Sequence, residues 1–444
     1  MPNEPLQRLF TESGWTLSQC ARAVNLIGGE NGTPLKYNGS AVHHWLGGTL
    51  PRSPAVRRFV VEAFTRRLRR PVTHAEAGFP ISVDHAQDPP DTVEGLIDLG
   101  RQDMDPSRRS VLGASLFSVA LTIPGWPDVV GRAEAVQTGR AQRIGMSDVD
   151  MVIAMTERVS DLDDEFGGRY ARPMAAAFLV NTVAPALLAD GPEHVRNAMR
   201  SAASDLCYLT GYMAVDEGLH GLAQKYYLKA LELAGAAKDH LTYCTTLRGM
   251  SVQAVDLGHG QTAMRLADSA AAASPEAGPR MRAFLAGQQA HAAAQIDDRH
   301  SALRYLREAE AAMDKAESRA TTFASYNPSS LLYHVGQVRY ELGDVKGSIE
   351  SLQQSDNLRH HSFRRNRVRY LSMLAERQLE LGHLEAACGT WGKVVEIYPH
   401  VESGQCDERM TTMHARIRPY LKNQTARALY EQARIVTPER LLPG

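Results

Sequence analysis

Two adjacent histidines, His43 and His44, lie in the segment SAVHHWLGG near the N-terminus. Val42 and Trp45 are three residues apart, which places both apolar side chains on one face of a helix. The other face then carries the two imidazoles and Ser40. Such side chains can exchange hydrogen bonds with base edges in the major groove of duplex DNA. The segment therefore has the chemistry of a DNA-reading helix.

A metal site is the alternative for this histidine pair. Adjacent residues on a helix point about 100° apart, and no third ligand is near. The chain has no C-x-x-C pair, no H-E-x-x-H and no G-x-S-x-G motif. We therefore expect neither a metal nor a cofactor, and a protein that is not an enzyme. The five scattered cysteines fit a reducing compartment.

Further helices must position the histidine segment. Thr16 and Gln19 have the capping-box spacing at the start of TLSQCARAVNLIG, and Ser53 before Pro54 begins a later helix. Arginines at the start of that later helix stand where backbone phosphates usually lie. The spacer from Gly28 to Gly39 is long for a helix-turn-helix and adds a lysine and a tyrosine. The predicted DNA contacts are Thr16, Gln19, Lys36, Tyr37, Ser40, Ala41, His43, His44, Arg52, Arg57 and Arg58.

Charge separates this N-terminal part from the rest. The whole chain carries a net charge of −1, but residues 1–81 hold ten Lys/Arg against five Glu. Residues 82–105 hold seven acids and one arginine, and SVDHAQDPPDTVEG has the composition of a linker. We expect a head at residues 1–80 and an acidic linker at 81–105. The basic string RRLRR at 66–70 is either a solvated helix end or a phosphate contact.

The later sequence repeats itself without β-type alternation. The repeats align on five anchors: Gly218, Gly258, Asp297, Gly343 and Gly382. Seven residues before them stand small residues: Gly211, Ser251, Ala290, Gly336 and Ala375. Five residues after them stand others: Ala223, Ala263, Ala302, Ser348 and Ala387. Small residues at these positions let two antiparallel helices approach closely.

This pattern resembles the tetratricopeptide repeat, most clearly in ELGDVKGSIESLQQS and ELGHLEAACGTWGKVVEIYP. The anchors are 40, 39, 46 and 39 residues apart, against about 34 in the standard repeat. The resemblance implies an α-solenoid whose first helices line an inner wall that binds a peptide, a small molecule or a protein. Packing between helices is the alternative role for these residues. The predicted wall comprises Tyr208, Tyr212, Arg248, His291, Tyr333, Gln337, Arg369 and Glu376.

We therefore predict an all-α chain with a bridging helical segment at 106–203, repeats at 204–400 and capping helices at 401–444. One helix is expected over roughly 92–125. The apolar run Val111–Ile123 follows Arg108-Arg109 and looks like a twin-arginine export signal. Its internal position favours a buried helix instead, and the N-terminus lacks a signal-peptide pattern. We expect a cytoplasmic protein without a membrane partner.

V-x-x-W-x-x-G-x-x-P, from Val42 to Pro51, resembles the recognition helix and turn of the Cro/phage-repressor type. A helix-turn-helix head with a repeat tail resembles the peptide-sensing regulators of Gram-positive bacteria and the actinobacterial NsdA-like regulators of development and antibiotic production. The Arg- and Ala-rich composition and the RRSVLG segment favour the second group. The resemblance implies a homodimeric transcription regulator that binds double-stranded DNA. The alternative is a tetratricopeptide protein-interaction scaffold whose head does not read DNA.

Overall fold

The computed structural model describes residues 2–30, 33–51, 53–68, 70, 72–79, 92–104, 143–273, 277–316, 326–360 and 363–442. In these ranges the regular elements are helices, and an isolated bridge between Arg143 and Asp190 is the only pairing of strand type. The predicted all-α class is therefore confirmed. The chain divides into a first unit (Met1–Ile153, Ala175–Gly211, Leu219–Ala273) and a second unit (Ala154–Met174, Tyr212–Gly218, Ser274–Gly444).

The head has four helices around its own core, in which Val42, Trp45 and Phe59 are buried. These helices are α1 (Glu4–Ser13), α2 (Leu17–Glu30), α3 (Gly39–Leu46) and α4 (Pro54–Leu68). Helix α3 begins one residue before the expected Ser40. The reason is Asn38, whose side chain caps the helix by accepting a hydrogen bond from the Ala41 amide at 3.3 Å.

The first unit also contains a connecting helix, α5 (Thr92–Met104), and further helices that lie wholly within this unit. They are η2 (Leu179–Val183), α9 (Ala184–Leu188), α11 (His220–Ala237), α12 (His240–Asp256) and α13 (Gly260–Ala272). Helix α5 packs on α11, η2 and α9. Gly100 permits the approach, because a Cβ there would lie 2.4 Å from Cγ2 of Val180. The rest of the helix predicted over 92–125 lies outside the described residues.

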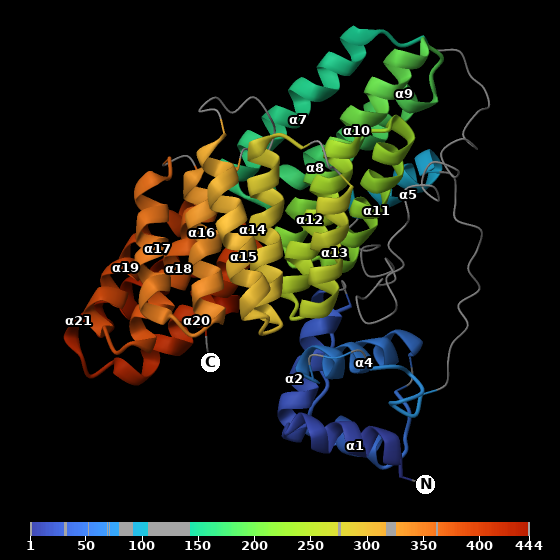
Figure 1. Ribbon diagram of the computed structural model, residues 1–444. Coiled ribbons are helices and arrows are strands. Elements are labelled where there is room, and N and C mark those ends of the chain that lie inside the picture. The colour runs from blue at the N-terminus through green and yellow to red at the C-terminus, as the bar shows by residue number, and fades with distance from the viewer. Residues whose placement is uncertain are drawn as a thin grey trace. The chain divides into compact units, whose positions relative to one another are not determined.

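Three further helices contribute to the second unit from earlier in the chain: α7 (Met146–Phe166), α8 (Gly168–Phe178) and α10 (Glu193–Asp216). The later helices form successive antiparallel pairs (Figure 1). These are α14 (Pro279–Gln295) with α15 (Arg299–Asp314), α16 (Pro328–Glu341) with α17 (Val345–Leu358), α18 (Arg364–Glu380) with α19 (Leu384–Ile397), and α20 (Gly404–Ile417) with α21 (Gln424–Val436). Short 3₁₀ turns follow α19, α20 and α21 at Tyr398–His400, Arg418–Tyr420 and Glu439–Leu441.

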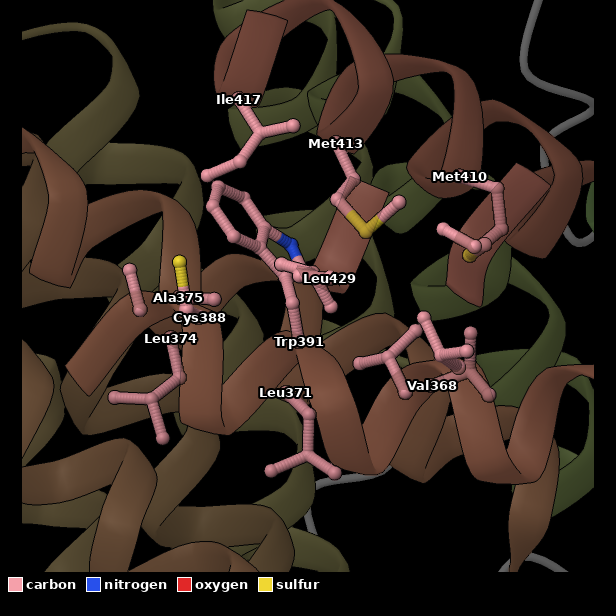
Figure 2. Packing of buried hydrophobic residues seen from close by; sticks show 14 of the residues in the cluster. Val368, Leu371, Leu374, Ala375, Cys388, Trp391, Met410, Met413, Ile417 and Leu429 are labelled. Atoms are coloured by element: carbon pink, nitrogen blue, oxygen red, sulfur yellow. The ribbon is translucent and has the colours of Figure 1, made fainter. Parts of the chain in front are cut away.

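Trp391 of α19 is the centre of the core at the C-terminal end of the second unit. Its indole has no exposed surface and lies among Leu371, Met413, Ile417 and Leu429 (Figure 2). Side chains from α18, α19, α20 and α21 thus share one core. Helices α20 and α21 form the last helix pair of the described chain.

The repeat pattern predicts the geometry of each hairpin. All five anchors adopt positive φ, and Asp297, with φ 61°, does so although it is not glycine. This left-handed conformation ends one helix and starts the turn to the next. The small residues are where the helices touch. Ser251 Oγ donates to the carbonyl of Ala263 at 2.8 Å, and Ser348 Oγ donates to that of Gly336 at 2.7 Å.

One helical run, Gly168–Leu188, is long and apolar enough to cross a membrane by length and composition alone, with a mean hydropathy of 1.3. Its charged residues have protein partners in the second unit. Arg172 is buried and binds Glu217 at 2.6 Å, and Arg169 binds Asp407 at 3.0 Å. These ion pairs favour a core helix of the protein over a membrane span.

Candidate functional site

The starts of α2 and α3 meet in the head. The capping box at α2 is present: the Thr16 amide donates to Gln19 Oε1 at 2.8 Å, and the Gln19 amide donates to Thr16 Oγ1 at 3.3 Å. Gly39, the first residue of α3, allows close contact, because a Cβ there would lie 3.2 Å from Cβ of Leu17. Exposed Thr16 and Gln19 therefore lie beside the helix start that carries exposed Ser40.

Helix α3 presents its histidines to solvent. Val42 and Trp45 are 2% and 5% exposed and pack in the head core, whereas His43 and His44 are exposed. The two imidazoles lie close together, with ring centroids 6.2 Å apart. Helix α3 thus has the inward and outward faces that its three-residue spacing predicts. Ala41 is half-buried at the border between the two faces.

The long spacer before α3 is held by a residue that the sequence does not single out. The Asn25 side chain accepts from the Tyr37 amide at 2.9 Å and donates to the Tyr37 carbonyl at 2.8 Å. The Tyr37 ring packs edge-on against Trp45, with centroids 5.0 Å apart. Tyr37 therefore fixes α3 against α2. A lone asparagine inside a helix gives no sequence signal for this clamp.

The start of α4 brings positive charge close to α3. Arg57 Nε donates to the carbonyl of Pro51 at 3.0 Å, which braces the turn between α3 and α4. Burial, and then the charges of Arg58 and Arg57, lower the pKa of His74. Arg57 and Arg58 thus place two positive charges near the start of α4. Lys36 is exposed in the spacer, and Arg52 lies outside the described residues.

The end of α4 has a different role from its start. Arg70 binds Glu12 at 2.8 Å and Glu76 at 2.7 Å, and Arg66 binds Glu30 and Glu62, each at 2.7 Å. Four of the head's glutamates thus pair with two arginines of the RRLRR string. These ion pairs give Arg66 and Arg70 a structural role within the head.

In the second unit, the first helices of successive hairpins contact one another through aromatic rings. Tyr333 of α16 and Tyr370 of α18 stack with centroids 4.2 Å apart, and the Arg359 guanidinium lies 4.6 Å above the Tyr370 ring. His291 of α14 and His334 of α16 have centroids 6.3 Å apart. We call the half-buried group Tyr333, Tyr370 and Arg359 the aromatic wall.

The other predicted wall residues are buried or half-buried, and the contacts below join them to other protein groups. In the first unit, Tyr208 stacks on Tyr227 with centroids 5.9 Å apart, and Arg248 is half-buried. In the second unit, Gln337 accepts from Arg377, and Glu376 binds Arg409 at 3.4 Å. These contacts are those of residues that pack between helices, which is the alternative role for the predicted wall residues.

A charged cluster around Arg365 joins distant parts of the second unit. Its guanidinium lies 2.9 Å from Asp163, 3.6 Å from Asp216 and 4.9 Å from the centre of the Tyr212 ring. Ser403 Oγ donates to Asp216 at 2.7 Å. Helices α7, α10 and α18 and the start of α20 are therefore tied together, and this unit has contacts beyond those between neighbouring repeats. Buried Arg369 belongs to the same helix as Arg365.

Residues 6–80 match the model of a family described as the SP15 N-terminal domain. The crystal structure of the APC/C hetero-tetramer Cut9–Hcn1 is among the similar solved structures, with a TM-score of 0.31 and 12% identity. The likeness covers 86% of this chain and 64% of that one. No curated protein matches the sequence. The helical-repeat assignment rests on the hairpins themselves.

Proposed function

We propose that this chain is a helical-repeat scaffold that binds a protein partner along the first helices of its hairpins. The observation that carries the proposal is the aromatic wall. The stacked tyrosines offer ring edges and hydroxyl groups, and the guanidinium offers donors for carbonyl or carboxylate groups, which suits an extended peptide segment. The wall is half-buried, so that part of its surface stays open to a partner.

The test is co-purification of partners with the full chain from its own host, with quantification by mass spectrometry. Tyr370→Ala should lose the partner. Tyr305→Ala is the matched control, because Arg304 lies over Tyr305 at the same 4.6 Å but on α15, the second helix of its hairpin. The proposal is wrong if both variants retain, or both lose, the same set of proteins.

A second function, binding of duplex DNA by the head, is favoured by the exposed pair His43 and His44. They lie on a capped helix whose start meets the start of α2, next to the positive region at α4. We propose that α3 enters the major groove and that the start of α4 contacts phosphates. A homodimer that places two heads on one site, regulating transcription as the NsdA-like resemblance implies, belongs to this proposal.

Fluorescence anisotropy of a labelled duplex with the full chain tests DNA binding. The logarithm of the affinity should fall linearly with the logarithm of salt concentration, because cations released from phosphates drive binding. If the full chain does not bind the duplex at low salt, the DNA-binding proposal is wrong and only the scaffold proposal remains. The two functions are compatible, because they use different units of the chain.

A further inference from the structure

A buried hydrogen bond within the first unit joins the head to the repeats. His259, in the turn before α13, places Nε2 2.7 Å from Oε1 of Glu62 on α4. Glu62 has no exposed surface, and His259 is 7% exposed. Because an ionised carboxylate only accepts hydrogen bonds, Nε2 carries the proton and donates it. The contact is a specific one between residues far apart in the sequence.

The head side of this contact is a small ion network. Arg66, one turn further along α4, binds both Glu62 and Glu30 of α2 at 2.7 Å. Burial alone would lower the pKa of Arg66, but the two carboxylates raise it, so the guanidinium stays charged. Two helices of the head thus hold Glu62 in place for His259.

The repeat side is equally well defined. A Cβ at Gly258 would lie 4.0 Å from the carbonyl oxygen of Arg66, so the turn between α12 and α13 follows the end of α4 closely. At the start of α11, burial and then the charge of Arg66 lower the pKa of His220 to about 3, which keeps this ring neutral. Gln253 of α12 donates to the His220 carbonyl at 2.9 Å. The turn before α13, the start of α11 and helix α12 therefore make up the repeat side of this contact.

The contact should resist breaking, because a buried carboxylate that loses a hydrogen-bond partner destabilises the folded chain. It also leaves His43 and His44 exposed on α3. We propose that Glu62 and His259 form a latch that holds the head against the α11–α13 end of the repeats, so that a rearrangement of these repeats reorients α3. The latch goes beyond both proposed functions. Its effect on the orientation of α3 toward DNA rests on the proposed binding of duplex DNA by the head.

Spin labels on the full chain test the latch without DNA. The five native cysteines are buried, so exposed positions are labelled selectively after Thr11→Cys on α1 and Gln261→Cys on α13. Distances between the labels are measured by pulsed electron–electron double resonance spectroscopy. We expect one narrow distribution in the otherwise unchanged chain and a broad one after His259→Leu or Glu62→Leu, because a leucine side chain can neither donate nor accept the hydrogen bond. The double variant should be no broader than either single one, because both remove the same bond.

Glu12→Gln is the matched control. It breaks an ion pair with Arg70 within the head, at 39% and 48% side-chain exposure, and should leave the distribution narrow. If Glu62→Leu unfolds the head, His259→Leu decides alone, since His259 lies outside the head. A broad distribution before any latch substitution, or a narrow one in folded His259→Leu, overturns the proposal. Neither result bears on whether the head binds DNA.

Discussion

The guanidinium of Arg365 lies 2.9 Å from the carboxyl group of Asp163, and this contact joins α18 to α7. Both side chains are at most 2% exposed, and Asp216 and Asp164 lie within 3.6 Å of the same guanidinium. Three carboxylates thus share one nearby cation, with Arg369 as a further positive charge. Burial raises the pKa of Asp163 to about 8, against the partly opposing effect of Arg365.

This shift predicts a pH dependence of stability. A folded-state pKa above the unfolded value means that folding favours the protonated carboxyl, so the free energy of unfolding falls as pH rises from about 4 to 8. Asp163→Asn should remove this part of the slope, which thermal melts between pH 5 and 8 would show. Asp161→Asn, at an exposed position on the same helix, should keep it. Parallel slopes for wild type and Asp163→Asn would contradict the prediction.

Truncation of Trp391 tests the core of the C-terminal helices. Trp391→Ala removes a fully buried indole that side chains of four helices surround, and we expect a loss of about 3–5 kcal/mol in the free energy of unfolding. Trp391→Phe fills part of the space and should cost less. Denaturant unfolding followed by circular dichroism measures both. A loss below about 1 kcal/mol for the alanine variant would mean that the indole does not organise this core.

The histidines of α3 should set sequence preference. We expect His43→Ala with His44→Ala to abolish selection of a site but to leave weak, salt-sensitive binding, since phosphate contacts remain. Selection from a random duplex library, followed by anisotropy, measures both properties. Unchanged selection and affinity would show that α3 does not enter the groove.

The arginines at the start of α4 should act on all duplexes alike. Arg57→Ala with Arg58→Ala should weaken binding uniformly and reduce the salt slope by roughly one unit for each lost phosphate contact. Arg304→Ala with Arg307→Ala removes two exposed arginines on α15 and is the control for the same change in net charge. A loss confined to one base position would assign these side chains to base reading.

The fold follows from local patterns. The anchor alignment places left-handed turns at Asp297 and at four glycines, and the small residues before and after each anchor mark the helix contacts. Such features repeat, so one sequence is enough to see them. The Asn25 clamp, the Glu62–His259 contact and the Arg365–Asp163 pair do not repeat. Each joins single residues from separate elements, which only the folded chain brings together.

The aromatic wall also shows what the pattern leaves out. Tyr333 is predicted from its position on a first helix, but its partner Tyr370 lies beside Arg369 in the sequence, and Arg369 was the expected wall residue. The repeat pattern gives the helical register only to within one residue here. That shift separates Arg369, which is buried, from Tyr370, which is half-buried.

Site-specific photocrosslinking in the native host tests whether a partner binds at the aromatic wall. A photoreactive phenylalanine analogue replaces Tyr370 in one full-length variant and Tyr305 in another, and both are irradiated in the native host. We expect position 370 to crosslink to a defined partner peptide and position 305 not to do so. Equal crosslinking at both positions, or none at position 370 while the protein is folded and abundant, would contradict it.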